Sequence, residues 1–196
     1  MQKNHLELDR CPHCNVAKPL LLRVWGATTQ NYAKENGRSW ANYQCSNCGG
    51  VVLTCAQSEK SNVSDIWPQP QAVHETVPNR AREFLSQAIS SLHAPSGAIM
   101  LTASAVDAML KDKGYRDGDL YSRIDAAAHD HLITSEMAAW AHEVRLDAND
   151  QRHADERANL PNETDARKVI EFTQALAQFL YVLPARVERG RKDATN

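Results

Sequence analysis

The sequence lacks the long apolar runs and short motifs that mark membrane proteins and several large enzyme classes. No stretch of about 18 consecutive apolar residues occurs, so no membrane-spanning helix is predicted. Residues 1–11 contain no apolar segment typical of a signal peptide. Neither a phosphate-binding glycine loop nor a GxSxG motif is present. We therefore expect a cytoplasmic protein that does not contact a membrane.

Charge of either sign is not in large excess, but it is unevenly distributed. Lysine and arginine total 22 and aspartate and glutamate total 24, which gives a net charge of −2. Residues 1–58 contain six basic and three acidic side chains and so carry +3, which leaves −5 for the remainder. A mildly basic N-terminal region is compatible with nucleic-acid contact, but an ordinary solvated surface is the favoured interpretation.

Cysteine is scarce, with five in the chain, but four of the five form two CxxC pairs. The first pair is Cys11 and Cys14, and the second is Cys45 and Cys48, thirty residues further on. Two CxxC turns can place four thiolates around one tetrahedral zinc ion, with Zn–S distances of about 2.3 Å. A structural zinc ion in a reducing compartment is therefore predicted in preference to disulfides.

The residues around these pairs predict a zinc ribbon over residues 1–57. Gly49 follows the second pair and can adopt the positive φ that such a turn requires. His13 is expected to be a bystander, and Cys55 to be a small buried side chain in a strand. An Asn-Gly dipeptide at 36–37 favours a turn between the first two of three short strands. These strands are expected at residues 18–25, 39–44 and 50–55.

The remaining sequence predicts a linker and then a helical bundle, so that the fold class is mainly α. Residues 58–78 are polar, rich in proline and without periodicity, which is typical of a linker. Residues 79–186 show apolar residues at helical spacing and predict five helices with short connections, the last ending at Pro184. Residues 187–196 are expected to form an exposed basic tail. The helices are expected to begin near Asn79, Pro95, Asp119, Thr134 and Thr164.

One polar stretch of the bundle combines side chains that can carry chemistry. Arg145, Asn149 and His153 are spaced at i, i+4 and i+8, so a continuous helix presents them on one face over about 12 Å. A histidine can transfer a proton near neutral pH, an arginine can hold a phosphate, and the asparagine can orient either. Alternatively, these side chains bond to helix ends, to neighbouring aspartates or to a dimer partner.

His129, Asp130 and His131 form a second cluster of side chains that could ligate a metal. Adjacent residues of a helix do not face the same way, so a solvated helix end is the favoured interpretation.

Four stretches of the helical region resemble an uncharacterised bacterial and phage family of the HEPN superfamily. The resemblance extends from Pro78 to Arg186, and members often carry an N-terminal zinc ribbon. It therefore implies a zinc ribbon followed by a HEPN-like α-helical bundle. The matching stretches are Ala103–Lys111, Gly118–Ile124, Trp140–His153 and Phe179–Arg186.

The resemblance implies a homodimer in which an arginine and a histidine from each subunit meet and cleave RNA without a metal, leaving a cyclic phosphate. On this basis Arg145 would stabilise the pentavalent phosphate, His153 would act as general acid or base, and Asn149 would support one of them. Active members usually have four to six residues between the arginine and the histidine, whereas this chain has seven. Ala148 stands where a glycine often allows a bend.

Three functions remain open from the sequence. The first is a metal-independent ribonuclease of a bacterial or phage defence or toxin type. The second is a non-catalytic RNA- or nucleotide-binding module with the zinc ribbon as an accessory grip. The third is a dimeric adaptor or scaffold that recruits a partner protein.

Overall fold

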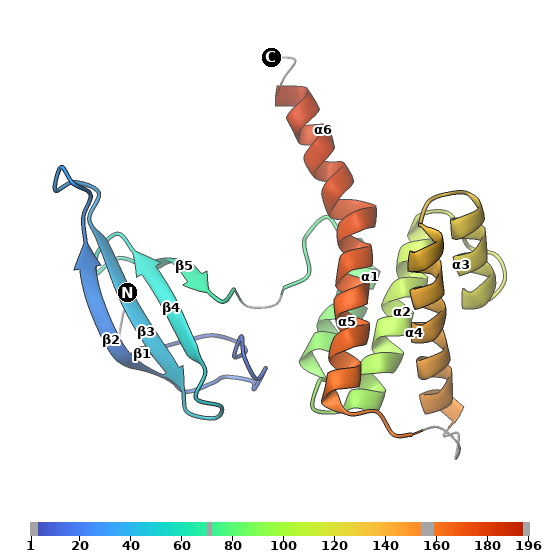
Figure 1. The fold of residues 1–196 in the computed structure, drawn as a ribbon, viewed down its shortest axis with the longest axis horizontal. Coiled ribbons are helices and arrows are strands. Elements are labelled where there is room, and N and C mark those ends of the chain that lie inside the picture. Colours follow the sequence, from blue (N-terminus) through green and yellow to red (C-terminus); the bar gives the residue numbers. More distant parts are fainter. Residues whose placement is uncertain (1–3, 70–71, 154–158, 194–196) are drawn as a thin grey trace. The chain divides into compact units, whose positions relative to one another are not determined.

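The computed structural model describes residues 4–69, 72–153 and 159–193, and its chain divides into two compact units. The first unit spans Met1–Gln71 and the second spans Ala72–Asn196. The first unit is a β-sheet and the second is helical (Figure 1), which confirms the predicted order of a small β module followed by a helical domain. No helix in the described ranges combines the length and apolar character needed to cross a membrane.

The first unit is an antiparallel sheet in which each strand pairs with the next along the chain. Its inner face covers a small core of six buried side chains, two of which are cysteines of the CxxC pairs. The strands are β1 (His5–Leu6), β2 (Leu21–Thr29), β3 (Arg38–Cys45), β4 (Val51–Ala56) and β5 (Val63–Trp67). The core residues are Cys11, Leu21, Ala41, Tyr43, Cys45 and Val52.

The sheet extends beyond the predicted zinc ribbon, because β5 lies within the stretch 58–78 that the sequence predicts to be a linker. β5 pairs with β4, with Ile66 opposite Thr54 and Trp67 opposite Leu53. As an edge strand it is held by backbone hydrogen bonds on one side and turns only Ile66 against the core. A strand with one inward apolar side chain gives too little alternation to be recognised in the sequence.

The second unit is built around α2, which packs against α1, α3, α4 and α5. Local signals set several helix starts as predicted. Pro95 occupies the first turn of α2, Asp119 accepts a hydrogen bond from the Ser122 N–H at 2.9 Å, and Thr134 accepts one from Met137 at 3.2 Å. The helices are α1 (Asn79–Ser90), α2 (Pro95–Asp112), α3 (Leu120–His129), α4 (Ser135–His153), α5 (Glu163–Ala177), the π-helix η1 (Gln178–Val182) and α6 (Leu183–Asp193).

The prediction that Pro184 ends the last helix was wrong. The chain continues from α5 through η1 into α6, so the predicted basic tail is helical as far as Asp193. Within η1 the Leu183 N–H bonds to the carbonyl of Gln178, five residues earlier. In a regular α-helix a proline ring collides with the carbonyl four residues before it, and the wider π turn provides the room that the ring needs.

The same π turn places the buried Tyr181 against α2. Its hydroxyl lies 3.0 Å from both the carbonyl oxygen of Met109 and Asp112 Oδ2, so these two acceptors share its single proton. Burial and the neighbouring Asp112 carboxylate both raise the pKa of Tyr181, so the hydroxyl keeps its proton across the physiological range. The bond therefore ties the last helical segment to the central helix.

Replacing Tyr181 by phenylalanine should lower the free energy of unfolding of the helical unit by about 1 kcal/mol, because one buried hydrogen bond is lost without a change of shape. Chemical denaturation followed by the helical circular dichroism signal measures this. Tyr32→Phe is the matched control, since Tyr32 is fully exposed. An equal effect of the two substitutions would contradict the role given to Tyr181.

Candidate functional sites

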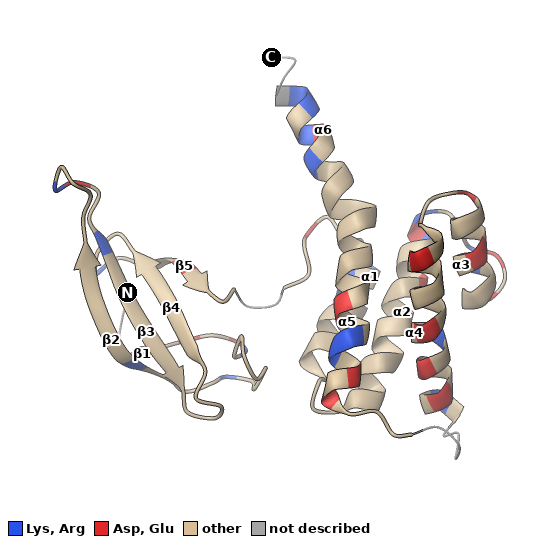
Figure 2. Ribbon diagram, viewed as in Figure 1, with Lys and Arg blue, Asp and Glu red and all other residues tan. Residues whose placement is uncertain are grey.

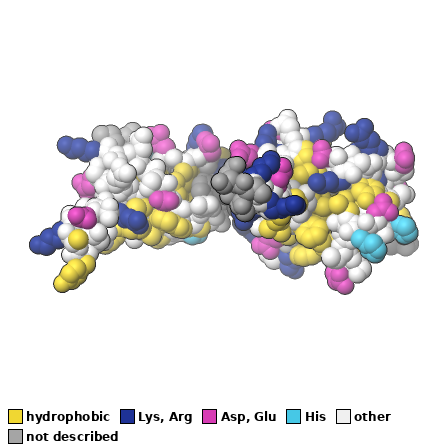
Figure 3. All heavy atoms as spheres, turned by 90° about the horizontal axis from the view of Figure 1, so that it is seen from above, with side chains coloured by type: hydrophobic (Ala, Val, Ile, Leu, Met, Phe, Trp, Pro, Cys, Tyr) yellow, Lys and Arg dark blue, Asp and Glu magenta, His cyan; other side chains and the backbone are white. Residues whose placement is uncertain are grey.

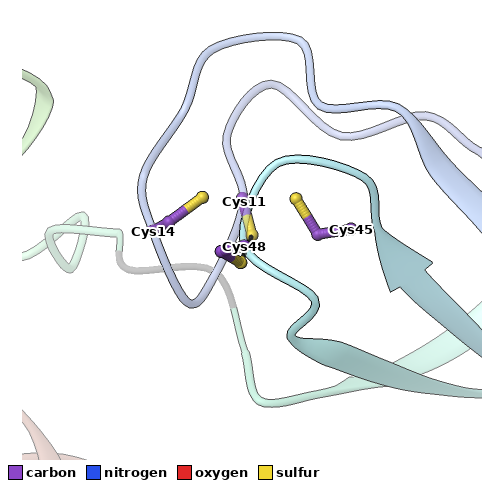
Figure 4. A group of neighbouring side chains, drawn as sticks. All are labelled: Cys11, Cys14, Cys45 and Cys48. Atoms are coloured by element: carbon purple, nitrogen blue, oxygen red, sulfur yellow. Dashed lines mark hydrogen bonds between the residues drawn. The ribbon is translucent and has the colours of Figure 1, made fainter.

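The four cysteines of the two CxxC pairs converge on one point. Cys11 and Cys14 lie in the loop between β1 and β2, whereas Cys45 ends β3 and Cys48 lies in the turn to β4 (Figure 4). Their sulfur atoms all lie within 4.8 Å of one another, and the sulfurs of Cys11 and Cys48 are 4.0 Å apart. Sulfurs bound tetrahedrally to zinc at about 2.3 Å would be separated by roughly 3.8 Å. The donor set and its spacing fit a zinc ion.

The two CxxC turns have matching backbone geometry. The Asn15 N–H donates to the carbonyl of Cys11 at 2.9 Å, and the Gly49 N–H donates to that of Cys45 at 2.8 Å. Asn15 and Gly49 both have positive φ, 57° and 74°, as the sequence predicts for Gly49. Asparagine and glycine are the residues that adopt this conformation most readily, so each pair is held ready for a metal by its own local sequence.

Hydrogen-bond donors lie near the sulfurs and favour the thiolate form of Cys14. Burial and the neighbouring thiols instead raise the pKa of Cys11 and that of Cys48. The His13 N–H lies 3.4 Å from Cys11 Sγ, and the Asn47 side-chain amide lies 3.4 Å from Cys14 Sγ. Burial alone would raise the pKa of Cys14, but hydrogen bonds from the Val16 N–H, from Asn47 and from neighbouring thiols lower it to about 7. Because a metal binds the thiolate, these donors lower the free-energy cost of loading the site.

His13 and Cys55 are not part of this cluster, as predicted. The ring of His13 turns away and its Nε2 lies 2.9 Å from the carbonyl of Val51. A side chain on Gly50 would meet that ring at 2.5 Å, which explains a glycine at this position. Cys55 is buried in β4. Four thiolates fill a tetrahedral shell and leave no open position for a substrate, so a zinc ion held here would have a structural role.

The sequence-predicted residues Arg145, Asn149 and His153 all lie on α4, which runs without a break to His153. Arg145 is half-buried and Asn149 is exposed, and both line a cavity of about 540 Å³. The exposed His153 at the end of the helix is not among the residues that line this cavity. The structure therefore brings two of the three residues to one site.

The cavity is a groove between helices, which we call the basic groove. α2 supplies its floor with small side chains, α1 and α4 supply residues on either side of that floor, and α3 begins at one end. The residues that line it are Arg80, Phe84, Ala103, Ser104, Asp107, Ala108, Lys111, Asp119, Leu120, Tyr121, Arg123, Arg145, Ala148, Asn149 and Arg152. Five of these are basic and two are acidic.

Two of the five cations share one carboxylate inside the protein. Asp107 Oδ1 lies 2.6 Å from Arg123 Nη1, and Asp107 Oδ2 lies 2.5 Å from Lys111 Nζ. Arg123 Nη2 also donates to the backbone carbonyls of Arg116 and Gly118. Arg123 therefore holds the loop before α3 to α2, and its buried Nε, like that of Arg145, has no hydrogen-bond partner among the described residues.

Arg145 is one of three groove cations for which no ion pair occurs among the described residues. No ion-pair partner for it occurs among the described residues, and its buried Nε has no hydrogen-bond partner there. Its guanidinium lies over the ring of Tyr121, 5.3 Å from the centroid. Hydrogen bonds from Ser122 to Asp119, with a smaller contribution from the Arg145 charge, lower the pKa of Asp119.

Arg80 and Arg152 extend the positive charge on either side of Arg145. Arg80 lies over the ring of Phe84, 5.7 Å from its centroid, and Arg152 is exposed one helical turn beyond Asn149. Neither has an ion-pair partner within the part of the chain that the structure describes. Acidic residues also occur along α4 (Figure 2), but Glu143, Asp147 and Asp150 are not among the residues that line the groove.

Arg80, Tyr121 and Arg152 are residues of this site that were not predicted from the sequence. The spacing of seven residues from Arg145 to Arg152 places both on one face of α4 and could have indicated Arg152. Arg80 and Tyr121 belong to other helices and join the groove only through packing. His142, for which the sequence indicates no role, lies against Tyr121 with ring centroids 4.7 Å apart and bonds to Asp125 at 2.9 Å.

The second predicted cluster, His129, Asp130 and His131, is an exposed helix end. His129 Nδ1 lies 3.1 Å from Asp130 Oδ1, and His131 has a positive φ of 58° that turns the chain out of the helix. Among the described residues only the four cysteines gather in a metal-binding arrangement.

The protein thus combines a four-cysteine β module with a helical domain that carries a basic groove. A family model, Domain of unknown function (DUF4145), matches residues 85–193, which is more than half of the chain. The chain belongs to this family, and the match includes most of the groove. Searches of curated proteins and of solved structures gave no significant match.

Metal removal tests the division into two units. Chelation, or Cys45→Ser, should unfold the β module and leave the helical circular dichroism signal unchanged, since no cysteine of the site lies in the helical unit. Zinc content by atomic emission should fall from one ion per chain towards none. Cys55→Ser is the control, because Cys55 lies outside the cluster. Cooperative loss of all helical signal would contradict two independently stable units.

Proposed function

We propose that the helical domain binds RNA by holding its phosphate groups in the basic groove. The observation that carries this proposal is that Arg80, Arg145 and Arg152 line one cavity without ion-pair partners in the described chain. Guanidinium groups bind phosphate oxygens through paired, charge-assisted hydrogen bonds. A cavity that keeps three such groups unpaired is suited to a ligand that carries more than one negative charge.

Aromatic side chains beside two of these arginines favour a nucleotide over inorganic phosphate. Tyr121 is 48% exposed next to Arg145, and Phe84 lies beside Arg80. Unpaired bases of RNA stack on such rings while arginines hold the neighbouring phosphates. Asn149 offers both a donor and an acceptor at the same wall, which suits a base edge or a ribose hydroxyl.

The dimensions of the groove are consistent with one or two nucleotides. Its floor runs along α2 from Ala103 to Lys111, which is about 12 Å at 1.5 Å per residue. Its volume of about 540 Å³ lies within the usual range of pockets for small ligands, roughly 300–1,000 Å³. The single strand is therefore the form of RNA that this groove would accept.

RNA cleavage, which the HEPN resemblance implies, requires a proton-transfer group beside the arginine. No histidine lines the groove, and α4 continues straight through Ala148 to His153. Within one chain the geometry therefore supports binding more directly than catalysis. Cleavage would need a second copy to bring its own His153 to Arg145, as in the homodimer that the resemblance implies.

Arg145→Gln should weaken binding of a fluorescein-labelled single-stranded 12-nucleotide RNA by about tenfold, because a charge-assisted contact contributes roughly 1.5–3 kcal/mol. Fluorescence anisotropy measures the dissociation constant. A plot of the logarithm of this constant against the logarithm of the salt concentration should become shallower by about one, which corresponds to one lost phosphate contact. Arg82→Gln is the control, since Arg82 lies on α1 outside the groove and bonds to Glu75 and Asn79.

The same samples report cleavage if the RNA is analysed on a gel without added divalent metal. Products with cyclic-phosphate ends that vanish with His153→Ala would establish the ribonuclease. Intact RNA with binding lost only in Arg145→Gln supports the binding function. Absence of any RNA binding by the folded, zinc-loaded protein would refute the proposal and favour the adaptor.

A further inference from the structure

Three of the four tryptophans lie on the outer face of the N-terminal sheet, opposite the small core. Residues paired across an antiparallel sheet share a face. Trp25 pairs with Asn42, Asn42 with Leu53, and Leu53 with Trp67, so these four residues form one row across β2 to β5. Trp40 lies two residues from Asn42 along β3 and therefore faces the same way. We call Trp25, Trp40 and Trp67 the tryptophan face.

Trp25 and Trp67 are exposed, and Trp40 is partly exposed and held in place by its neighbours. Trp25 is 53% exposed and Trp67 is 42% exposed. Trp40 stacks on Trp67 with ring centroids 6.0 Å apart and an interplanar angle of 29°, and its Nε1 donates to Thr29 Oγ1 at 2.8 Å. Hydrophobic side chains are visibly exposed over this unit (Figure 3). The core does not need these rings, because its six members lie on the other side.

A polar cavity of about 520 Å³ adjoins the stacked tryptophans. Cys55 and Asp65 line it and pair with each other, and Cys55 also pairs with Trp40, so all three lie in one row. Arg38, two residues before Trp40 on the same face, lines it too and has no ion-pair partner in the described ranges. The lining residues are Asn36, Gly37, Arg38, Cys55, Ala56, Gln57, Ser64 and Asp65.

We propose that the tryptophan face is a second RNA-binding site, at which unpaired bases of a single strand stack on the indole rings. The adjoining cavity supplies hydrogen-bonding groups and a positive charge, which stacking on the rings alone does not provide. Asn36, Gln57 and Asp65 offer donors and acceptors to a base edge, and Arg38 offers a cation to the phosphate. Stacking accepts any base, so this site contributes affinity with little sequence preference.

The chemistry of the face favours RNA over a protein partner. A protein-docking surface buries a continuous apolar centre from which charged residues are depleted. Here Asn42 lies between Trp25 and Leu53 in one row. In the next row Gln44 lies between the exposed Leu22 and Val51. Arg38 and Asp65 flank the stacked rings. Alternation of flat rings with amides and a free arginine is typical of surfaces that bind single-stranded nucleic acid. The tryptophan face and the basic groove are both proposed to bind RNA, but they have no residue in common. Each site can therefore be tested by its own substitutions.

Intrinsic fluorescence of the full chain reports on this face once Trp140 of α4 is replaced by phenylalanine. In the Trp140→Phe protein, a single-stranded 12-nucleotide oligoadenylate should quench the three remaining tryptophans. Trp67→Ala and Trp25→Ala should each weaken binding by about tenfold. Tyr32→Ala is the aromatic control, since Tyr32 lies in the loop between β2 and β3 and is fully exposed. Zinc content and circular dichroism must be unchanged in every variant.

Adding Arg145→Gln separates the two sites. Quenching that persists in this variant supports a site independent of the groove, whether or not the groove proposal holds. Absence of quenching, equal quenching by the double-stranded form of the same length, or unchanged affinity in both tryptophan variants would overturn the proposal. A tryptophan variant that loses zinc is replaced by Trp67→Leu, for which the same loss of affinity is expected.

Discussion

Burial of α2 is the constraint on which the helical unit depends. This helix contacts four others, and eight of its residues are buried, so each neighbour is positioned by how closely it can approach α2. Small side chains at Ala103, Ser104 and Ala108 leave space where larger residues would fill the gap between α1 and α4. The groove is therefore a consequence of the same packing that stabilises the domain.

Only some of the basic side chains that line the groove form ion pairs within the described part of the protein. Asp107 holds Arg123 and Lys111, which fixes the start of α3 against α2. Arg145 is left half-buried beside an aromatic ring, with its Nε unpartnered among the described residues. A buried donor without a partner costs stability, and a phosphate that supplies the missing acceptor would recover that cost on binding.

The β module obtains its stability in another way. Six buried residues form a small core for a five-stranded sheet, and two of them are cysteines whose sulfurs belong to the metal cluster. A zinc ion bound by these four cysteines would join the loop before β2 to the turn after β3 and so replace apolar area that the module does not have. The core lies on the inner face, so the tryptophans of the outer face are free for another use.

Local sequence alone determined the four cysteine ligands, the positive φ at Gly49 and the starts of the helices at Pro95, Asp119 and Thr134, because each depends on residues a few positions away. Contacts between separate segments decide the rest. They determine that β5 forms, that a helix continues beyond Pro184, and which side chains line the basic groove. Arg145 and Asn149 could be proposed from their spacing on one helix. The seven-residue spacing from Arg145 could likewise have indicated Arg152. Only the tertiary structure decided that Arg80 joins them and that His153 does not, because packing against α2 selects which side chains share a cavity.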